Sequence, residues 1–174
     1  MRHLARRAPD RDTAELPRLI LRGAIGGTML AHGVKHARSL DGTARWFESI
    51  GFRQPELQAR TSAVVEIGSG SALIAGIGTP LQCAAVVGTM SVAIRSVHLA
   101  NGYFITDEGW EYTTFLSAAA IALAALGSGR FSVDRRLGVD RIGTPARRAL
   151  LAAGLGVGGA AAQLATFWRK PPAS

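Results

Sequence analysis

Five long apolar segments alternate with polar stretches along the chain. They carry few charges, and they cover residues 19–34, 61–78, 81–99, 112–127 and 149–168. A helix needs about 17–25 residues to cross the hydrocarbon core of a bilayer. The helices of a soluble alanine-rich bundle would instead show a polar face at helical spacing. The fourth and fifth segments show no such face, so the pattern predicts five transmembrane helices.

Glycine and proline mark where these helices end and where they pack. Gly76, Gly78 and Pro80 predict a tight hairpin between the second and third helices, because glycine suits a helix end and proline a helix start. Residues 44–50 of the first long loop are typical of a short interfacial helix. Small residues let helix backbones approach each other in lipid. Six glycines in the apolar segments are therefore expected to pack between helices: Gly23, Gly27, Gly68, Gly70, Gly154 and Gly158.

Composition agrees with a membrane protein and excludes several other classes. Apolar types make up 48% of the 174 residues and charged types only 18%, which excludes a disordered chain. Cys83 is the one cysteine, which excludes an intramolecular disulfide framework, a cysteine-rich zinc site and a CxxC redox pair.

The net charge of +8 is unevenly distributed. Arginines dominate the tail 1–18 and the loop 128–148, whereas the loop 101–111 has acidic residues and no basic ones. By the positive-inside rule, the tail and the loop 128–148 face the cytoplasm of a bacterial-type cell, with the chain in its inner membrane. Arginine there also meets anionic lipid. Nucleic-acid binding is not expected, because no base-reading or stacking residues accompany the charge.

Ionisable residues inside the apolar segments are the candidates for a functional site. A charge alone in lipid costs about 2.5–3.5 kcal/mol on insertion scales, so such residues face partners. All the candidates fall in the predicted outer half of the membrane: His32, Lys35, His36, Glu66, Arg95 and His98. We expect Glu66 and Arg95 to pair across the hairpin, ringed by His32 and His98.

Three interpretations of this polar site stay open. The Glu66–Arg95 pair could only lock the register of the helices. The site could bind a small polar headgroup or a quinone, with histidine as donor or proton carrier. It could also belong to a proton or ion pathway. We expect no metal site, because His32 and His36 lack further ligands of clear spacing, and we see no catalytic set.

Several motifs occur in an order that resembles the DoxX family of four-helix membrane proteins. They are Ala-His-Gly-Val-Lys-His at 31–36, Glu-Ile-Gly-Ser-Gly at 66–70, the stretch 101–112, and Gly-Ser-Gly-Arg-Phe-Ser-Val-Asp at 127–134. The last motif is the most specific, and the resemblance covers about residues 18–138. Two positions depart from the family pattern: His36 stands where a lysine is usual, and Ser69 replaces a glycine.

The resemblance implies an all-α fold, an integral membrane four-helix bundle with an additional C-terminal fifth transmembrane helix. The expected organisation is a basic cytoplasmic tail (1–18), a DoxX-like four-helix domain (19–127), a basic cytoplasmic loop (128–148), and the fifth helix with a short tail (149–174). No cofactor is expected to be covalently bound.

Some relatives look like subunits of membrane quinone oxidoreductases that act on sulfur compounds. Others look like anchors that gather soluble redox enzymes under oxidative stress. The sequence therefore favours a non-catalytic membrane subunit or scaffold of a redox assembly, in contact with lipid and protein partners. A quinone-interacting oxidoreductase subunit is the alternative, with quinone as its ligand, and a small transporter is less favoured.

Overall fold

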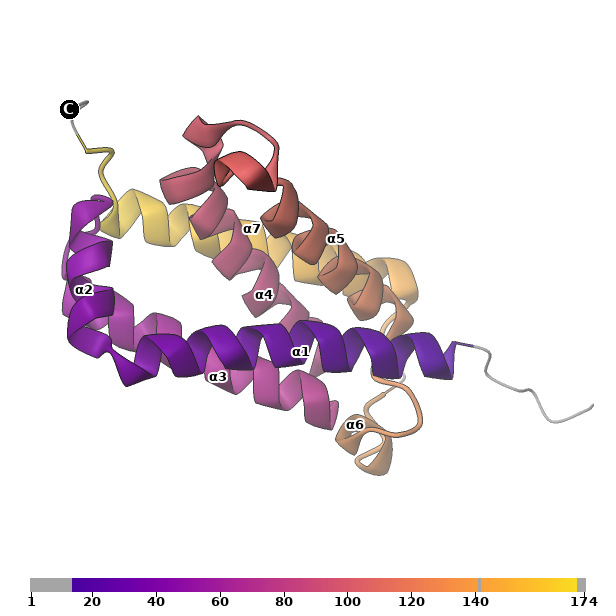
Figure 1. Cartoon of the computed structure of the whole chain (residues 1–174). Coiled ribbons are helices and arrows are strands. Elements are labelled where there is room, and N and C mark those ends of the chain that lie inside the picture. Colours follow the sequence, from indigo (N-terminus) through magenta and orange to yellow (C-terminus); the bar gives the residue numbers. More distant parts are fainter. Residues whose placement is uncertain (1–13, 141, 172–174) are drawn as a thin grey trace, which may run out of the picture.

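The computed structural model describes residues 14–140 and 142–171, and the regular elements among these residues are all helical. The five long helices are α1 (Glu15–Arg38), α3 (Pro55–Ala75), α4 (Thr79–Ala93), α5 (Glu111–Leu126) and α7 (Pro145–Phe167). Each covers most of one predicted apolar segment, so the all-α prediction is confirmed. Successive long helices run in opposite directions (Figure 1). We call the side where α1, α4 and α7 begin the α6 end, and the opposite side the α2 end.

Shorter helices form the connections. The amphipathic helix α2 (Leu40–Ser49) joins α1 to α3 near the predicted interfacial helix, and α6 (Val133–Arg136) lies between α5 and α7. The α4 helix continues through a π-helical turn at Ile94–His98 and a 3-10 turn at Leu99–Asn101. A π-helical turn changes the direction of the side chains in it and after it, and Arg95 is one of these side chains.

The turn between α3 and α4 forms as predicted. Gly76 ends α3 with φ of 71°, and Gly78 precedes α4 with φ of 58°. Both values lie in the left-handed region, where a side chain would cause strain. Pro80 occupies the first turn of α4, where its missing N–H leaves no helical bond unmade.

The backbones of α1 and α3 touch at glycines. A Cβ on Gly26 would lie 2.7 Å from the carbonyl oxygen of Gly70, and one on Gly33 would lie 2.7 Å from the backbone nitrogen of Ile67. Gly70 is thus the one predicted packing glycine in a close interhelical contact. A Cβ at any of the other five predicted positions would meet nothing within 4 Å: Gly23, Gly27, Gly68, Gly154 and Gly158. Those five lie on other faces of their helices, because spacing alone does not say which face of a helix meets its neighbour.

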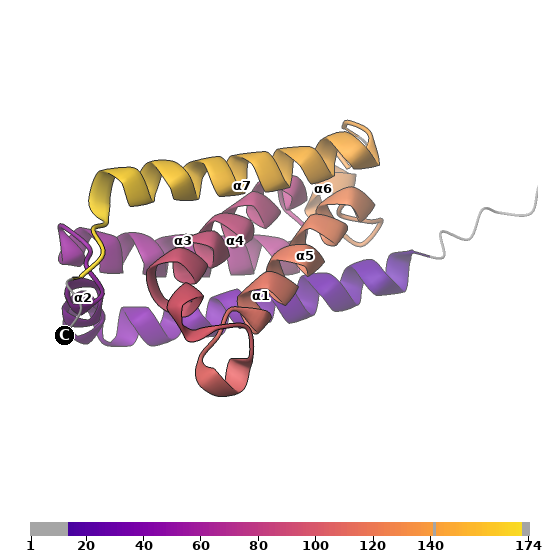
Figure 2. The same ribbon diagram turned by 90° about the horizontal axis from the view of Figure 1, so that it is seen from above.

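The last helix, α7, packs along α4 and α5, opposite α1 (Figure 2). Gly156 allows this approach, because a Cβ there would lie 2.6 Å from Cβ of Val87. Among the described residues, two helical segments are long and apolar enough to cross a membrane, namely residues 79–101 and α7, whereas α5 is apolar but shorter. Only 17% of the most apolar stretch of α7 is buried inside the molecule. An apolar helix with so much exposed surface is suited to lipid rather than to water.

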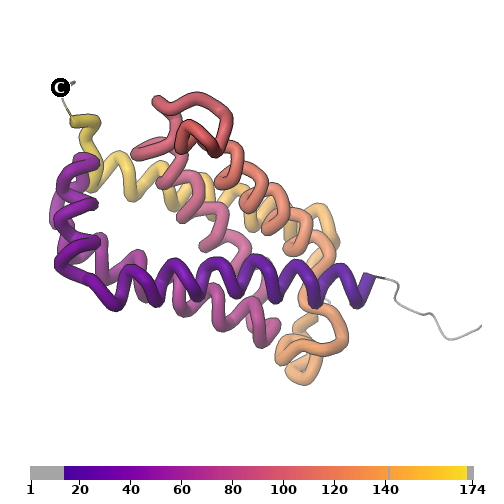
Figure 3. The backbone as a smooth tube through the Cα atoms, in the orientation of Figure 1, coloured from indigo at the N-terminus to yellow at the C-terminus, as the bar shows by residue number. Residues whose placement is uncertain are grey.

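Two clusters of buried side chains hold the helices together. The larger lies between α1, α3, α4, α5 and α7 and includes Ile25, Leu73 and Leu123. The smaller lies at the α2 end, where the chain after α7 returns to α2 (Figure 3). There Trp168, which follows α7, is buried and donates a hydrogen bond from Nε1 to the carbonyl of Ile50 at 2.8 Å. The end of the fifth long helix is therefore fixed to the first loop.

Candidate functional site

Arg22 is the centre of a buried polar network at the α6 end. Its side chain is 3% exposed and extends from the second turn of α1. Nε donates to the carbonyl of Leu73 at 2.9 Å, and Nη2 donates to that of Ile74 at 2.6 Å. Nη1 donates to the carbonyls of Ser128 and Phe131 at 2.9 and 2.7 Å. The guanidinium thus binds backbone carbonyls at the end of α3 and in the loop after α5.

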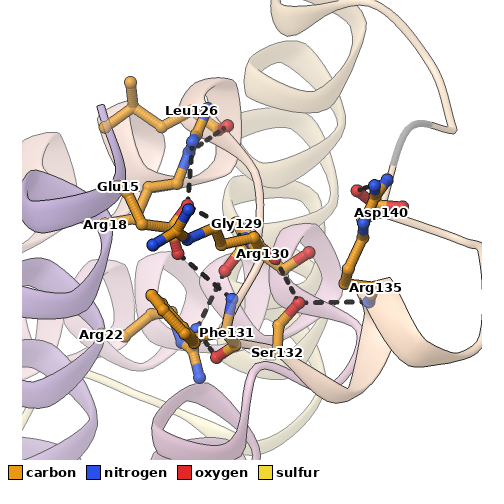
Figure 4. A network of polar contacts seen from close by, with 11 residues as sticks. Glu15, Arg18, Arg22, Leu126, Gly129, Arg130, Phe131, Ser132, Arg135 and Asp140 are labelled. Atoms are coloured by element: carbon orange, nitrogen blue, oxygen red, sulfur yellow. Dashed lines mark hydrogen bonds and ion pairs between the residues drawn. The ribbon is translucent and has the colours of Figure 1, made fainter. Parts of the chain in front are cut away.

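Glu15 and Arg18 extend this network to the same loop (Figure 4). The Glu15 carboxylate accepts hydrogen bonds from the backbone N–H groups of Arg130 and Phe131 at 3.0 and 3.2 Å. Arg18 donates from Nε to the carbonyl of Leu126 at the end of α5, at 3.0 Å. One face of α1 therefore supplies both donors and acceptors to the loop.

Asp134 completes the loop's attachment to the α3–α4 turn. Its carboxylate is buried and accepts from the backbone N–H groups of Gly78 and Thr79, at 2.8 and 3.3 Å. Negative charge at a helix N-terminus is stabilising, and here it lies at the start of α4. We call residues 127–134 the latch, because the segment joins α1, the α3–α4 turn and the end of α5. The most specific motif of the sequence coincides with the latch and has a structural role.

A second polar cluster, centred on Glu66, lies toward the α2 end between α1 and α3. The Glu66 side chain is 2% exposed, and Ser62 donates to its Oε1 at 2.6 Å. Oε2 makes no well-aligned hydrogen bond, and Nδ1 of His36 is 3.2 Å from it. His36 and Glu66 are therefore in contact, but His36 does not satisfy Oε2 with a hydrogen bond of good geometry. His36 also lies 6.4 Å from the Trp46 ring of α2, between ring centroids.

A small cavity of about 40 Å³ lies beside this cluster and is lined by Glu66 and His32, with Tyr112 among the other lining residues. It has room for one or two water molecules. The structure thus places Glu66 between His36 and a small, mostly apolar cavity that His32 also lines.

The predicted Glu66–Arg95 pair does not form. The Arg95 guanidinium lies over the Trp168 ring, 4.5 Å from its centroid. Glu66 sits where α3 packs on α1, whereas α4 turns toward α7 at its end. The π-helical turn at Ile94–His98 also alters the register on which the expected pair depended. Equal depth along the helices did not fix which face of its helix Arg95 uses.

The other two candidates lie apart from Glu66. His98 contacts the carbonyl of Glu108 in the connection to α5, and Lys35 is exposed. Within the described residues, no three histidine, cysteine or carboxylate side chains gather in a way that could hold a metal ion. Cys83 is fully buried in the larger cluster.

Several residues of these sites were not singled out from the sequence. Glu15 and Ser62 gave no signal, because single polar residues near the ends of apolar segments are common. Arg22 did give one, as a basic residue inside an otherwise apolar segment, but its four carbonyl partners were not predictable from spacing. Asp134 was visible at the end of the motif 127–134, but the two backbone N–H groups at the start of α4 that donate to it were not predictable from spacing.

A comparison with known protein families identifies the family of residues 18–99. The family model described as DoxX matches residues 18–99. This part of the chain belongs to the DoxX family. No match was found among curated proteins or solved structures.

The DoxX match includes Arg22, His32, His36, Glu66 and Arg95. It ends before the latch and before α7, so the resemblance of residues 100–138 stays a prediction from the motifs. The apolar helices and the DoxX match together make this chain a membrane protein in contact with lipid.

Proposed function

We propose that this DoxX protein is a non-catalytic membrane subunit or scaffold of a redox-related assembly, in a bacterial-type inner membrane with its N-terminus in the cytoplasm. The support comes from how the polar groups are used. Arg22, Glu15 and Asp134 are all bound to backbone groups of neighbouring elements. Groups held in this way position helices and do not react with a substrate. The residues of the network thus hold the neighbouring helices and the latch in place.

The observation that carries the proposal is the charge at the α6 end. Three arginines of the latch and α6 are exposed there: Arg130, Arg135 and Arg136. We call them the basic face. Among the described residues of that end, Glu15 and Asp134 are buried, and Asp140 pairs with Arg135 at 3.2 Å. The exposed charge is therefore positive, which favours docking of an acidic partner from the cytoplasm.

Charge reversal on the basic face tests this proposal. The double change Arg130→Glu and Arg136→Glu should remove the protein partner that co-purifies with the tagged full chain in mild detergent, after crosslinking in cells. The matched control is Arg45→Glu with Arg60→Glu, which alters two exposed arginines toward the α2 end and should keep the partner. Absence of any reproducible partner of the wild-type chain would overturn the proposal, as would equal loss in both double variants.

The alternative, a quinone-interacting oxidoreductase subunit, has one observation in its favour. His32 and Glu66 share a cavity, as a quinone-binding site would require. However, a volume of about 40 Å³ suits water rather than a quinone ring. Arg95 and His98, which that alternative also needs, contact other groups. The scaffold is therefore the better supported function.

A further inference from the structure

A second, larger hollow lies at the α6 end, between the starts of α4 and α7 and residues 127–140 and 142–143. Its volume is about 440 Å³, within the range of roughly 300–1,000 Å³ typical of sites for small molecules. Its walls are mostly apolar and include Leu81, Val139, Ile142 and Leu151. All four side chains are exposed in the structure. We call this hollow the α4–α7 groove.

Most of the charged groups that line the groove already have partners. Arg148 donates to the carbonyls of Ala124 and Ala125 at 3.1 and 2.7 Å. Asp134 is bound to the α3–α4 turn, and Asp140 pairs with Arg135.

Arg147 is different. Its backbone N–H is bound by the hydroxyl of Thr144 at 3.2 Å, but no acceptor among the described residues contacts its guanidinium. Among the described lining residues, Arg147 is therefore the charged side chain without a partner, exposed at the positive end of the α7 dipole.

The position of the groove indicates what fills it. Residues 79–101 and α7 are the two segments suited to cross the membrane, and the groove lies where both begin. That level corresponds to the boundary between lipid headgroups and acyl chains. A basic residue there attracts anionic lipid, and the apolar walls suit an acyl chain.

We propose that the α4–α7 groove binds one anionic phospholipid, with its phosphate on Arg147 and an acyl chain along Leu81 and Leu151. This inference depends on the membrane placement of α4 and α7 and not on the scaffold role. It also uses none of the basic-face residues, so either proposal can fail while the other stands.

Native mass spectrometry of the purified full chain in a neutral detergent tests the proposal. The probes are phosphatidylglycerol, phosphatidylcholine with the same acyl chains, and glycerol phosphate. One phosphatidylglycerol should bind per chain, roughly tenfold more tightly than phosphatidylcholine, because the choline cation of phosphatidylcholine offsets the phosphate charge that attracts Arg147. Glycerol phosphate should not bind, because it has no acyl chain. Equal binding of the two lipids, or binding of glycerol phosphate as tight as that of the lipid, would overturn the proposal.

Three variants locate the lipid. Arg147→Gln should weaken phosphatidylglycerol binding roughly tenfold and phosphatidylcholine binding much less, so that the preference for the anionic lipid is lost. Leu81→Trp should weaken binding of both lipids, because the larger ring fills the groove. Arg136→Gln removes an exposed arginine of the same end that does not line the groove, and should change neither affinity.

Since Arg147 and Leu81 are exposed, both variants should melt near the wild-type temperature without added lipid. Unchanged lipid binding in Arg147→Gln, or in Leu81→Trp, would place the lipid elsewhere and refute the proposal.

Discussion

At the scale of single residues, the buried ionisable groups find partners close in space but not those that equal depth suggested. Glu66 lies against His36 and Ser62, both within hydrogen-bonding reach, and Arg95 stacks on Trp168. A buried carboxylate without a partner is costly, so the partner that is present controls how each substitution affects stability.

A double-mutant cycle tests which residue Glu66 is coupled to. We expect Glu66→Gln and His36→Ala each to lower the free energy of unfolding, and the double change to cost less than the sum by about 0.5–3 kcal/mol. Glu66→Gln with Arg95→Gln should be additive within about 0.5 kcal/mol, because the two side chains share no contact. The measurement is reversible denaturation of the purified protein in detergent. Coupling of Glu66 to Arg95 that exceeds its coupling to His36 would contradict the structure.

At the scale of elements, close contacts between backbones occur where two helices actually cross. Gly26 and Gly33 of α1 face α3, and Gly156 of α7 faces α4. The pattern of glycines along one helix shows that close packing is possible but contains no information about the orientation of its neighbour. The turn at Gly76–Pro80 was predictable because its signals are local, whereas helix faces depend on the whole arrangement.

Two glycines in α1 provide a matched comparison. We expect Gly26→Ala to lower the free energy of unfolding by about 1–3 kcal/mol, because its Cβ would lie 2.7 Å from a backbone oxygen of Gly70 that cannot move alone. Gly23→Ala should cause no loss, since its Cβ would meet nothing within 4 Å. Thermal melting in one detergent compares the two. If both variants lose the same stability, or only Gly23→Ala does, the α1–α3 contact is wrongly placed.

At the scale of the whole molecule, the sequence was sufficient to predict the long helices, their order and the alternation of their directions. The reason is that the length of an apolar segment and the residues of a turn are local signals. It was insufficient for the latch, since the bonds of Arg22 join residues 51 to 109 positions apart in the chain. The candidate site was predictable in part. Glu66 and the histidines of α1 were chosen on residue type and depth, but the role of Ser62 and the attachment of α7 through Trp168 depend on tertiary contacts.

The alternation of the helices predicts that the two ends lie on opposite sides of the membrane. Cysteines can be placed at one exposed position near each end in a Cys83→Ala background: Arg136→Cys in α6 and Asp107→Cys in the α4–α5 connection. Arginine-rich segments stay in the cytoplasm, so a membrane-impermeant maleimide should label Asp107→Cys in intact cells and Arg136→Cys only after the membrane is opened. Both variants should sediment with membranes, and both should be labelled once the cells are permeabilised.

Labelling of both cysteines in intact cells would mean that the ends share one side, and the helices could not then cross the bilayer in alternation. The reverse pattern would keep the spans but invert the chain, which would place the basic face outside and remove the cytoplasmic docking of a redox partner. Recovery of the protein in the soluble fraction without detergent would exclude the membrane itself. The apolar outer surface of α7 would then have to be covered by protein, because that much exposed apolar side chain does not remain in water.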